Sequence, residues 1–150
     1  MTFAQSAHAG LWLQATGMSS YHLSQRSFYT GTVAIKFLQG FGVGAQYLQL
    51  KNSNADTAYA YGPKAGLFIG GFEASATYLL RSSRSFDGNQ YTGGGYALNV
   101  GYSPTLLNRF RLGVLFTHTE LLLNKKDGAS LIPATKISAW SPMLALALEL

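Results

Sequence analysis

The stretch Met143-Leu144-Ala145-Leu146-Ala147-Leu148-Glu149-Leu150 places a leucine at every second position. Side chains of a β-strand point alternately to its two faces, so a period of two separates one face from the other. The four leucines therefore share an apolar face, and the methionine, alanines and glutamate share the opposite face. This pattern predicts an amphipathic strand.

The same alternation occurs in three earlier stretches of the chain. Its apolar positions are Val33/Ile35/Phe37, Tyr59/Tyr61/Ala65/Leu67/Ile69 and Phe110/Leu112/Val114/Phe116. The residues between them are mostly small or polar, and the exceptions are Leu38, Phe68 and Leu115. Strands that alternate between an apolar and a polar face are typical of a barrel with lipid outside and a polar interior.

The composition also indicates little water-facing surface. Of the 150 residues, 47% are apolar and only 11% are charged, whereas soluble domains have about 25% charged residues. The sequence has no run of 18 apolar residues, so no transmembrane helix is expected. Nine tyrosines and nine phenylalanines favour strands. Two alternatives remain at this point, a transmembrane β-barrel and a soluble β-sandwich with an unusual surface.

The chain divides into eight expected strands, which are 9–19, 28–39, 43–51, 57–69, 72–82, 91–102, 109–123 and 134–150. Short turns at 39–42, 70–71 and 103–108 alternate with mostly longer polar connections at 20–27, 52–56, 83–90 and 124–133. Bacterial outer-membrane barrels combine short periplasmic turns with longer outer loops. The sequence therefore predicts an all-β fold, an eight-stranded antiparallel up-and-down transmembrane β-barrel over 9–150 with both termini periplasmic.

One hairpin can be placed in register from its turn. Gly70-Gly71 is a two-residue connection of the kind that forms tight turns with positive φ. It places Ile69 opposite Phe72 on the apolar face. A shift of either strand by one residue would turn Glu73 or Lys64 toward lipid.

The charged residues of the polar face are expected to form a network inside the barrel. Eight strands leave room only for side chains, and lone buried charges are costly. We therefore expect a filled interior without a wide pore, and a narrow channel is the alternative. The expected members of this network are Lys36, Lys64, Glu73, Arg81, Arg111 and Glu149.

The net charge of +5 is not concentrated in one block. Five basic residues fall in or beside the longer connections, namely Arg26, Lys51, Arg84, Lys125 and Lys126. Lysine and arginine favour contacts with phosphate groups, so lipopolysaccharide, a host surface or another envelope protein are the expected partners. A nucleic-acid partner is not expected, because the sequence has neither a basic stripe nor a nucleic-acid-binding motif.

Aromatic residues bracket the expected strands. One set lies toward the outer rim and contains Tyr21, Phe28, Tyr29, Tyr59, Tyr61, Tyr91 and Trp140. A second set lies toward the short turns and contains Phe37, Phe41, Phe72, Tyr102 and Phe110. With two such girdles, the chain resembles small outer-membrane barrels such as the OmpA transmembrane domain and the OmpX/Ail adhesins. The resemblance implies a Gram-negative outer-membrane protein with a structural or interaction role.

One group of residues supports an enzymatic alternative. His118 and Glu120 share the outward face of 109–123, and Lys136 and Ser138 share that of 134–150 at about the same height. A serine, a histidine and a carboxylate on the lipid face resemble the outer-membrane lipid A deacylases. The resemblance would make His118 the base and Ser138 the nucleophile of an acyl-ester hydrolysis. Contact of these polar residues with lipopolysaccharide headgroups is the preferred interpretation, so no enzyme is expected.

The first eight residues are expected to precede the barrel. Ala7-His8-Ala9 has the small-x-small form of a signal-peptide cleavage site, so 1–8 is interpreted as a periplasmic segment with a signal-peptide remnant. The chain has no cysteine, and its three histidines are isolated in sequence. Neither a metal site nor a cofactor is therefore expected.

Overall fold

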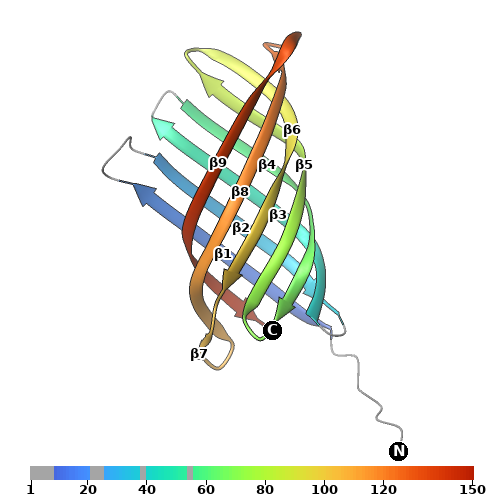
Figure 1. Ribbon diagram of the computed structural model, residues 1–150, viewed down its shortest axis with the longest axis vertical. Coiled ribbons are helices and arrows are strands. Elements are labelled where there is room, and N and C mark those ends of the chain that lie inside the picture. The colour runs from blue at the N-terminus through green and yellow to red at the C-terminus, as the bar shows by residue number, and fades with distance from the viewer. Residues whose placement is uncertain (1–8, 21–25, 38–39, 54–55) are drawn as a thin grey trace, which may run out of the picture.

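The computed structural model describes residues 9–20, 26–37, 40–53 and 56–150 (Figure 1). These residues form strands throughout, with no helix among them that is long and apolar enough to cross a membrane. The strands are β1 (Gly10–Ser20), β2 (Arg26–Lys36), β3 (Phe41–Ser53), β4 (Asp56–Ile69), β5 (Phe72–Phe86), β6 (Asn89–Tyr102), β7 (Thr105–Leu107), β8 (Phe110–Lys126) and β9 (Ala129–Glu149). The segment 1–8 lies outside the described residues.

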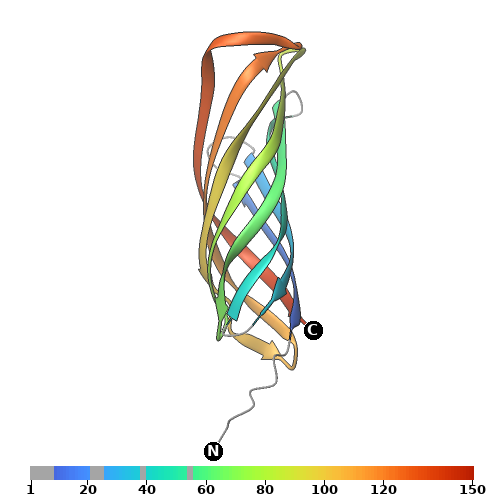
Figure 2. The ribbon, with the colours of Figure 1, turned by 90° about the vertical axis from the view of Figure 1, so that its right-hand side faces the viewer.

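The strands form one antiparallel sheet that closes into a ring. Sequence neighbours pair from β1 to β6, β8 pairs with β6 and β9, and β9 pairs with β1. Figure 2 shows the strands wound around a common axis. The predicted all-β antiparallel fold is confirmed. The described strands number nine instead of eight, because three residues of the connection expected at 103–108 form β7, which pairs with β8.

The ring is closed by a short junction between the first and last strands. β1 pairs with β9 from Trp12 opposite Glu149 to Gly17 opposite Leu144, and Leu11 exchanges backbone hydrogen bonds with Leu150 just below. By contrast, the pairing of β8 with β9 runs from Phe110 to Lys126. Figure 1 shows β9 and β1 diverging above their paired section.

Two connections that were expected to be long loops are mainly strand. β5 and β6 are joined by Asp87-Gly88, and β8 and β9 are joined by Asp127-Gly128. All four turn residues have positive φ, between 48° and 83°, the conformation that aspartate–glycine pairs adopt in two-residue hairpins. The upper parts of these four strands project beyond the other strands (Figure 1).

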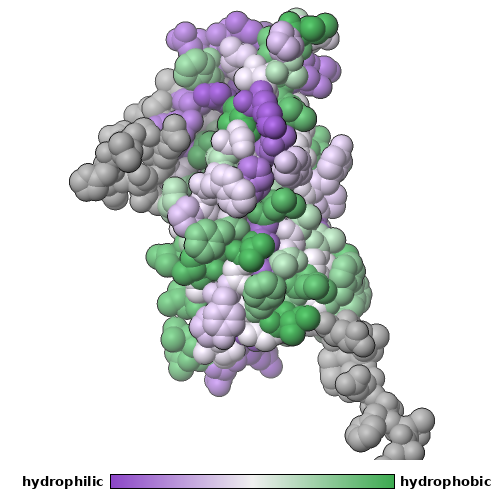
Figure 3. Space-filling model, in the orientation of Figure 1, coloured by the Kyte–Doolittle hydropathy of each residue, from purple (hydrophilic) through white to green (hydrophobic). Residues whose placement is uncertain are grey.

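The two faces of the strands alternate as the sequence predicts. On β9, Met143 and Ala145 are buried inside the ring, whereas Leu144 and Leu146 are 69% and 52% exposed. The predicted pairing of Ile69 with Phe72 is present. Figure 3 shows apolar residues over much of the lower part of the molecule, and a mixture of polar and apolar residues at its upper end. The apolar face thus forms an outer belt around the ring.

The interior holds two apolar clusters beside its polar groups. The smaller cluster lies beside the lower charges and consists of Trp12, Ala34, Phe68 and Ala147. The larger cluster consists of Phe28, Leu48, Ala58, Ala60, Leu79, Ala97, Leu115, Leu121, Met143 and Ala145. Phe28 therefore packs inside the ring instead of joining the outer aromatic girdle. The polar face was expected to be mostly small or polar, with Phe68 and Leu115 among its exceptions, and both of these side chains are buried inside the ring.

We expect Gly44→Ala to lower the free energy of unfolding by about 2 to 3 kcal/mol, and Gly31→Ala to leave it within about 1 kcal/mol. A Cβ at Gly44 would lie 1.9 Å from the backbone oxygen of Val33 on the neighbouring strand, whereas a Cβ at Gly31 would meet nothing within 4 Å. Urea unfolding followed by tryptophan fluorescence measures both variants. Equal losses would contradict the close approach of β2 and β3.

Candidate functional site

A buried ion pair lies in the lower half of the interior. The Nζ atom of Lys64 on β4 is 2.6 Å from Oε1 of Glu73 on β5, and the two side chains are 0% and 2% exposed. Gln14 donates to the Glu73 carboxylate at 2.9 Å and Ser75 donates to it at 2.7 Å. Lys64 also donates to the Thr32 hydroxyl at 3.3 Å. Both charges are thus compensated by neighbouring side chains.

Neutral polar side chains continue this network across the ring. Asn99 on β6 donates to Ser75 at 3.2 Å and to Gln46 on β3 at 3.3 Å. Thr77 donates to the same Gln46 oxygen at 2.5 Å, and Thr117 on β8 donates to Asn99 at 2.8 Å. These contacts link strands from opposite parts of the sheet, so side chains occupy the middle of the ring.

A second group of charges lies toward the lower end, where Glu149 accepts from two cations. Lys36 on β2 donates to one carboxylate oxygen, and the Nη2 atom of Arg111 on β8 is 2.8 Å from the other. Arg111 also donates to the backbone oxygen of Ser103 at 3.3 Å. The indole of Trp12 lies 5.2 Å from the Lys36 ammonium and 5.8 Å from the Arg111 guanidinium. This group fills the lower part of the interior.

The structure brings together five of the six charged residues expected inside the ring, and Arg81 is the exception. Arg81 is exposed, because the β5–β6 pairing shifts register between Leu79 and Ser82. Such a bulge adds a residue to one strand and changes the face of the residues within it. The expected interior position of Arg81 is therefore wrong.

The basic residues expected in outer loops lie on strands. Arg26 is the first residue of β2, with its side chain outside the described part, and Lys51 is exposed on β3. Lys125 and Lys126 end β8 beside the upper turn. Lys51 was expected at the end of the strand 43–51, and it lies on β3. Lys125 and Lys126 were expected in the connection 124–133 and lie on a strand instead, because the Asp127-Gly128 turn extends β8.

Arg84 is held in an ion pair within the chain, which the sequence did not indicate. Its Nε and Nη2 atoms donate to the two carboxylate oxygens of Asp56 at 2.8 and 2.9 Å. The bidentate hydrogen bonds raise the pKa of the Arg84 guanidinium. Asp56, at the start of β4, is itself buried and accepts from Asn52 at 2.8 Å. Arg84 is thus a structural link between β4 and β5 and not a free basic contact.

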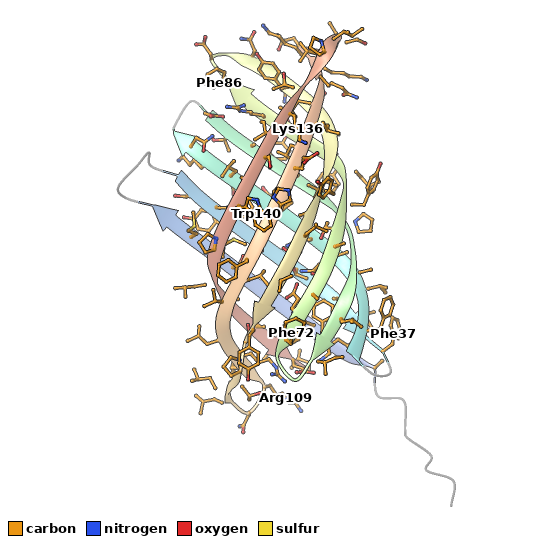
Figure 4. All side chains as sticks on the ribbon, in the orientation of Figure 1. Phe37, Phe72, Phe86, Arg109, Lys136 and Trp140 are labelled. Atoms are coloured by element: carbon orange, nitrogen blue, oxygen red, sulfur yellow. The ribbon has the colours of Figure 1, made fainter. Side chains whose placement is uncertain are left out.

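The group proposed for ester hydrolysis lies on the outer face, at the heights expected. Glu120 on β8 pairs with Ser138 on β9, and His118 pairs with Trp140. The His118 and Trp140 ring centroids are 4.4 Å apart. Figure 4 shows Lys136 above Trp140 on this face.

The hydrogen bonds of this group differ from those of a catalytic triad. The Glu120 carboxylate accepts from the Tyr96 hydroxyl at 3.0 Å and lies 3.0 Å from the Lys136 ammonium. The Nδ1 atom of His118 is buried without a hydrogen-bond partner among the described residues. A triad needs a carboxylate on one imidazole nitrogen and a nucleophile on the other. Glu120 is instead engaged with Tyr96 and Lys136.

No protein-family model matches this chain, and the search of the curated proteins finds no match either. Within the described ranges, no group of three or more histidine, cysteine or acidic residues could hold a metal ion. The function is therefore inferred from the distribution of polar and apolar side chains.

Proposed function

We propose that this chain is a transmembrane β-barrel of a Gram-negative outer membrane, with a filled interior and a structural or interaction role in the cell envelope. The observation that carries this proposal is the reversal of the usual burial pattern. Lys64 and Glu73 are buried, whereas Trp140 and Leu144 are 74% and 69% exposed. Water-soluble proteins keep charges outside and rarely expose large apolar surfaces. Lipid as the outer solvent accounts for both features.

The height of the apolar belt supports the same proposal. On β5, the outward side chains are uncharged from Phe72 to Leu80, and Arg81 follows. Nine residues span about 26 Å along a strand, or about 20 Å across the membrane at a tilt near 40°. On β9, the outward side chains from Trp140 to Leu148 are also uncharged, and this stretch is likewise nine residues long. This height is close to the apolar band of about 25 Å in known outer-membrane barrels.

The filled interior favours a non-conducting barrel over the channel alternative. Ion pairs and amide–hydroxyl contacts cross the ring, and two buried apolar clusters pack beside them. A water-filled path would require these side chains to separate. The hydrolase alternative has less support, because Glu120 is paired with Lys136 and not with His118.

We expect the purified chain to require detergent, to insert into phosphatidylcholine vesicles and to resist extraction by alkaline carbonate. In planar bilayers it is expected to give no single-channel conductance. Stable monomers in water without detergent would contradict the membrane location and favour a soluble barrel. Stepwise conductance after insertion would contradict the filled interior and favour the narrow channel.

The upper ends of β5, β6, β8 and β9, here called the upper projection, are the part of the barrel that we propose binds partners. β5, β6, β8 and β9 continue above the belt and end in two charged turns. Lys125 and Lys126 lie beside one of these turns. Cations at this height favour phosphate-bearing lipid or an acidic protein surface.

A further inference from the structure

A groove lies on the outer face of the ring where the apolar belt ends. It has a volume of about 700 Å³ and is lined by residues of β5, β6 and β8. Gly93-Gly94-Gly95 forms part of its wall. Tyr78 and Leu80 line its lower part, and Arg81 and Lys125 line its upper part. The groove is thus apolar toward the membrane and cationic above it.

Two irregularities of the sheet create this groove. The register shifts between Leu79 and Ser82 in the β5–β6 pairing, and between Thr92 and Gly93 in the β6–β8 pairing. The first shift exposes Arg81 beside Leu80. At Gly93, a Cβ would lie 1.8 Å from the Leu122 backbone oxygen, so the close approach of β8 excludes a side chain there.

The charge of the groove is positive and uncompensated. Its lining contains the cations Arg81 and Lys125 and no acidic residue. Neither cation forms an ion pair with a described residue. The neighbouring carboxylate, Glu120, is already paired with Lys136. The groove therefore offers two free cations to an anion.

We propose that the groove binds a phosphorylated lipid of the outer leaflet, with its phosphate between Arg81 and Lys125. An acyl chain would lie along Tyr78 and Leu80, which are 65% and 63% exposed. Charge complementarity at the upper end and apolar surface at the lower end together match an anionic amphiphile. A water-soluble phosphate would contact only the cations and leave the apolar wall uncovered. This inference rests on the proposed membrane location.

The test is native mass spectrometry of the detergent-solubilised protein with dimyristoyl phosphatidylglycerol or dimyristoyl phosphatidylcholine, which have the same acyl chains. Wild type is expected to retain the anionic lipid preferentially. Arg81→Gln and Lys125→Gln are each expected to weaken its binding about fivefold, and the double variant about 25-fold, at roughly 1 kcal/mol per basic residue. Arg109→Gln removes one exposed guanidinium at the opposite end and is expected to leave binding unchanged.

Three results would overturn the lipid site. The first is equal binding of both lipids by wild type. The second is that Arg109→Gln weakens binding as much as Arg81→Gln, and the third is that inorganic phosphate displaces the anionic lipid completely. The last result would identify a site for free anions. A chain that inserts into phosphatidylcholine vesicles without preferring the anionic lipid contradicts only this inference. A chain that inserts into no vesicle contradicts the membrane proposal as well.

Discussion

Glu73→Ala is expected to lower the free energy of unfolding by about 3 to 5 kcal/mol, because it leaves the ammonium of Lys64 buried without an opposite charge. The Lys64 side chain is fully buried in the structure. The substitution also removes the acceptor of Gln14 and Ser75. Urea unfolding of the protein in lipid vesicles, followed by tryptophan fluorescence, measures the loss.

Two further variants separate the ion pair from a general loss of packing. Lys64→Met combined with Glu73→Leu is expected to be more stable than Glu73→Ala alone, because neither charge is then left unpaired. Lys36→Met is the matched control. Glu149 keeps Arg111 as a partner and is 31% exposed, so a loss of about 1 kcal/mol or less is expected. Equal losses for Glu73→Ala and Lys36→Met would contradict the buried character of the Lys64–Glu73 pair.

Val100→Arg is expected to destabilise the folded protein in lipid by about 2 to 4 kcal/mol, the cost of arginine near the middle of an outer-membrane barrel's lipid face. Val100 lies on β6 between Leu98 and Tyr102 and is 52% exposed. The arginine side chain would point into the proposed hydrocarbon layer. Vesicle insertion and urea unfolding measure the effect.

Ile132→Arg is the matched control for this prediction. It also replaces a β-branched residue by arginine, at a position that is 92% exposed on the upper projection. An effect within about 0.5 kcal/mol is expected, as for other surface substitutions. If the chain were surrounded by water throughout, both substitutions would be mild. Equal and small effects of Val100→Arg and Ile132→Arg would thus contradict the proposal that the apolar belt faces lipid.

The alternation of apolar and polar residues was sufficient to predict the antiparallel strands and five of the six expected inward charges. The leucines at every second position of β9 indicate which face of the strand is apolar. The Gly70-Gly71 turn sets the register of β4 and β5, and the structure contains both features. The two aspartate–glycine turns carry an equally specific signal. Their polar neighbours made these hairpins resemble loops, so strand ends and the positions of Lys125 and Lys126 were missed.

The remaining differences depend on information that no local pattern contains. A bulge changes the phase of a strand by one residue, and nothing in the sequence around Leu79 marked the change that exposes Arg81. Partners such as Lys36 and Glu149 lie 113 positions apart. Their contact depends on the register of every strand between them, which explains why the network's members were predictable and its individual bonds were not.

The short junction between β1 and β9 has a consequence for the order of assembly. Leu11 and Leu150 exchange backbone hydrogen bonds of 2.8 and 2.9 Å. Closing the ring therefore encloses a loop that contains nearly the whole chain. Loop-closure entropy increases with the length enclosed, whereas the hairpins enclose only a few residues. Contacts between neighbouring strands are therefore favoured early, and the two outermost strands meet last. We therefore expect the sheet to form first as an open, curved sheet and its two edge strands, β1 and β9, to pair in the final step.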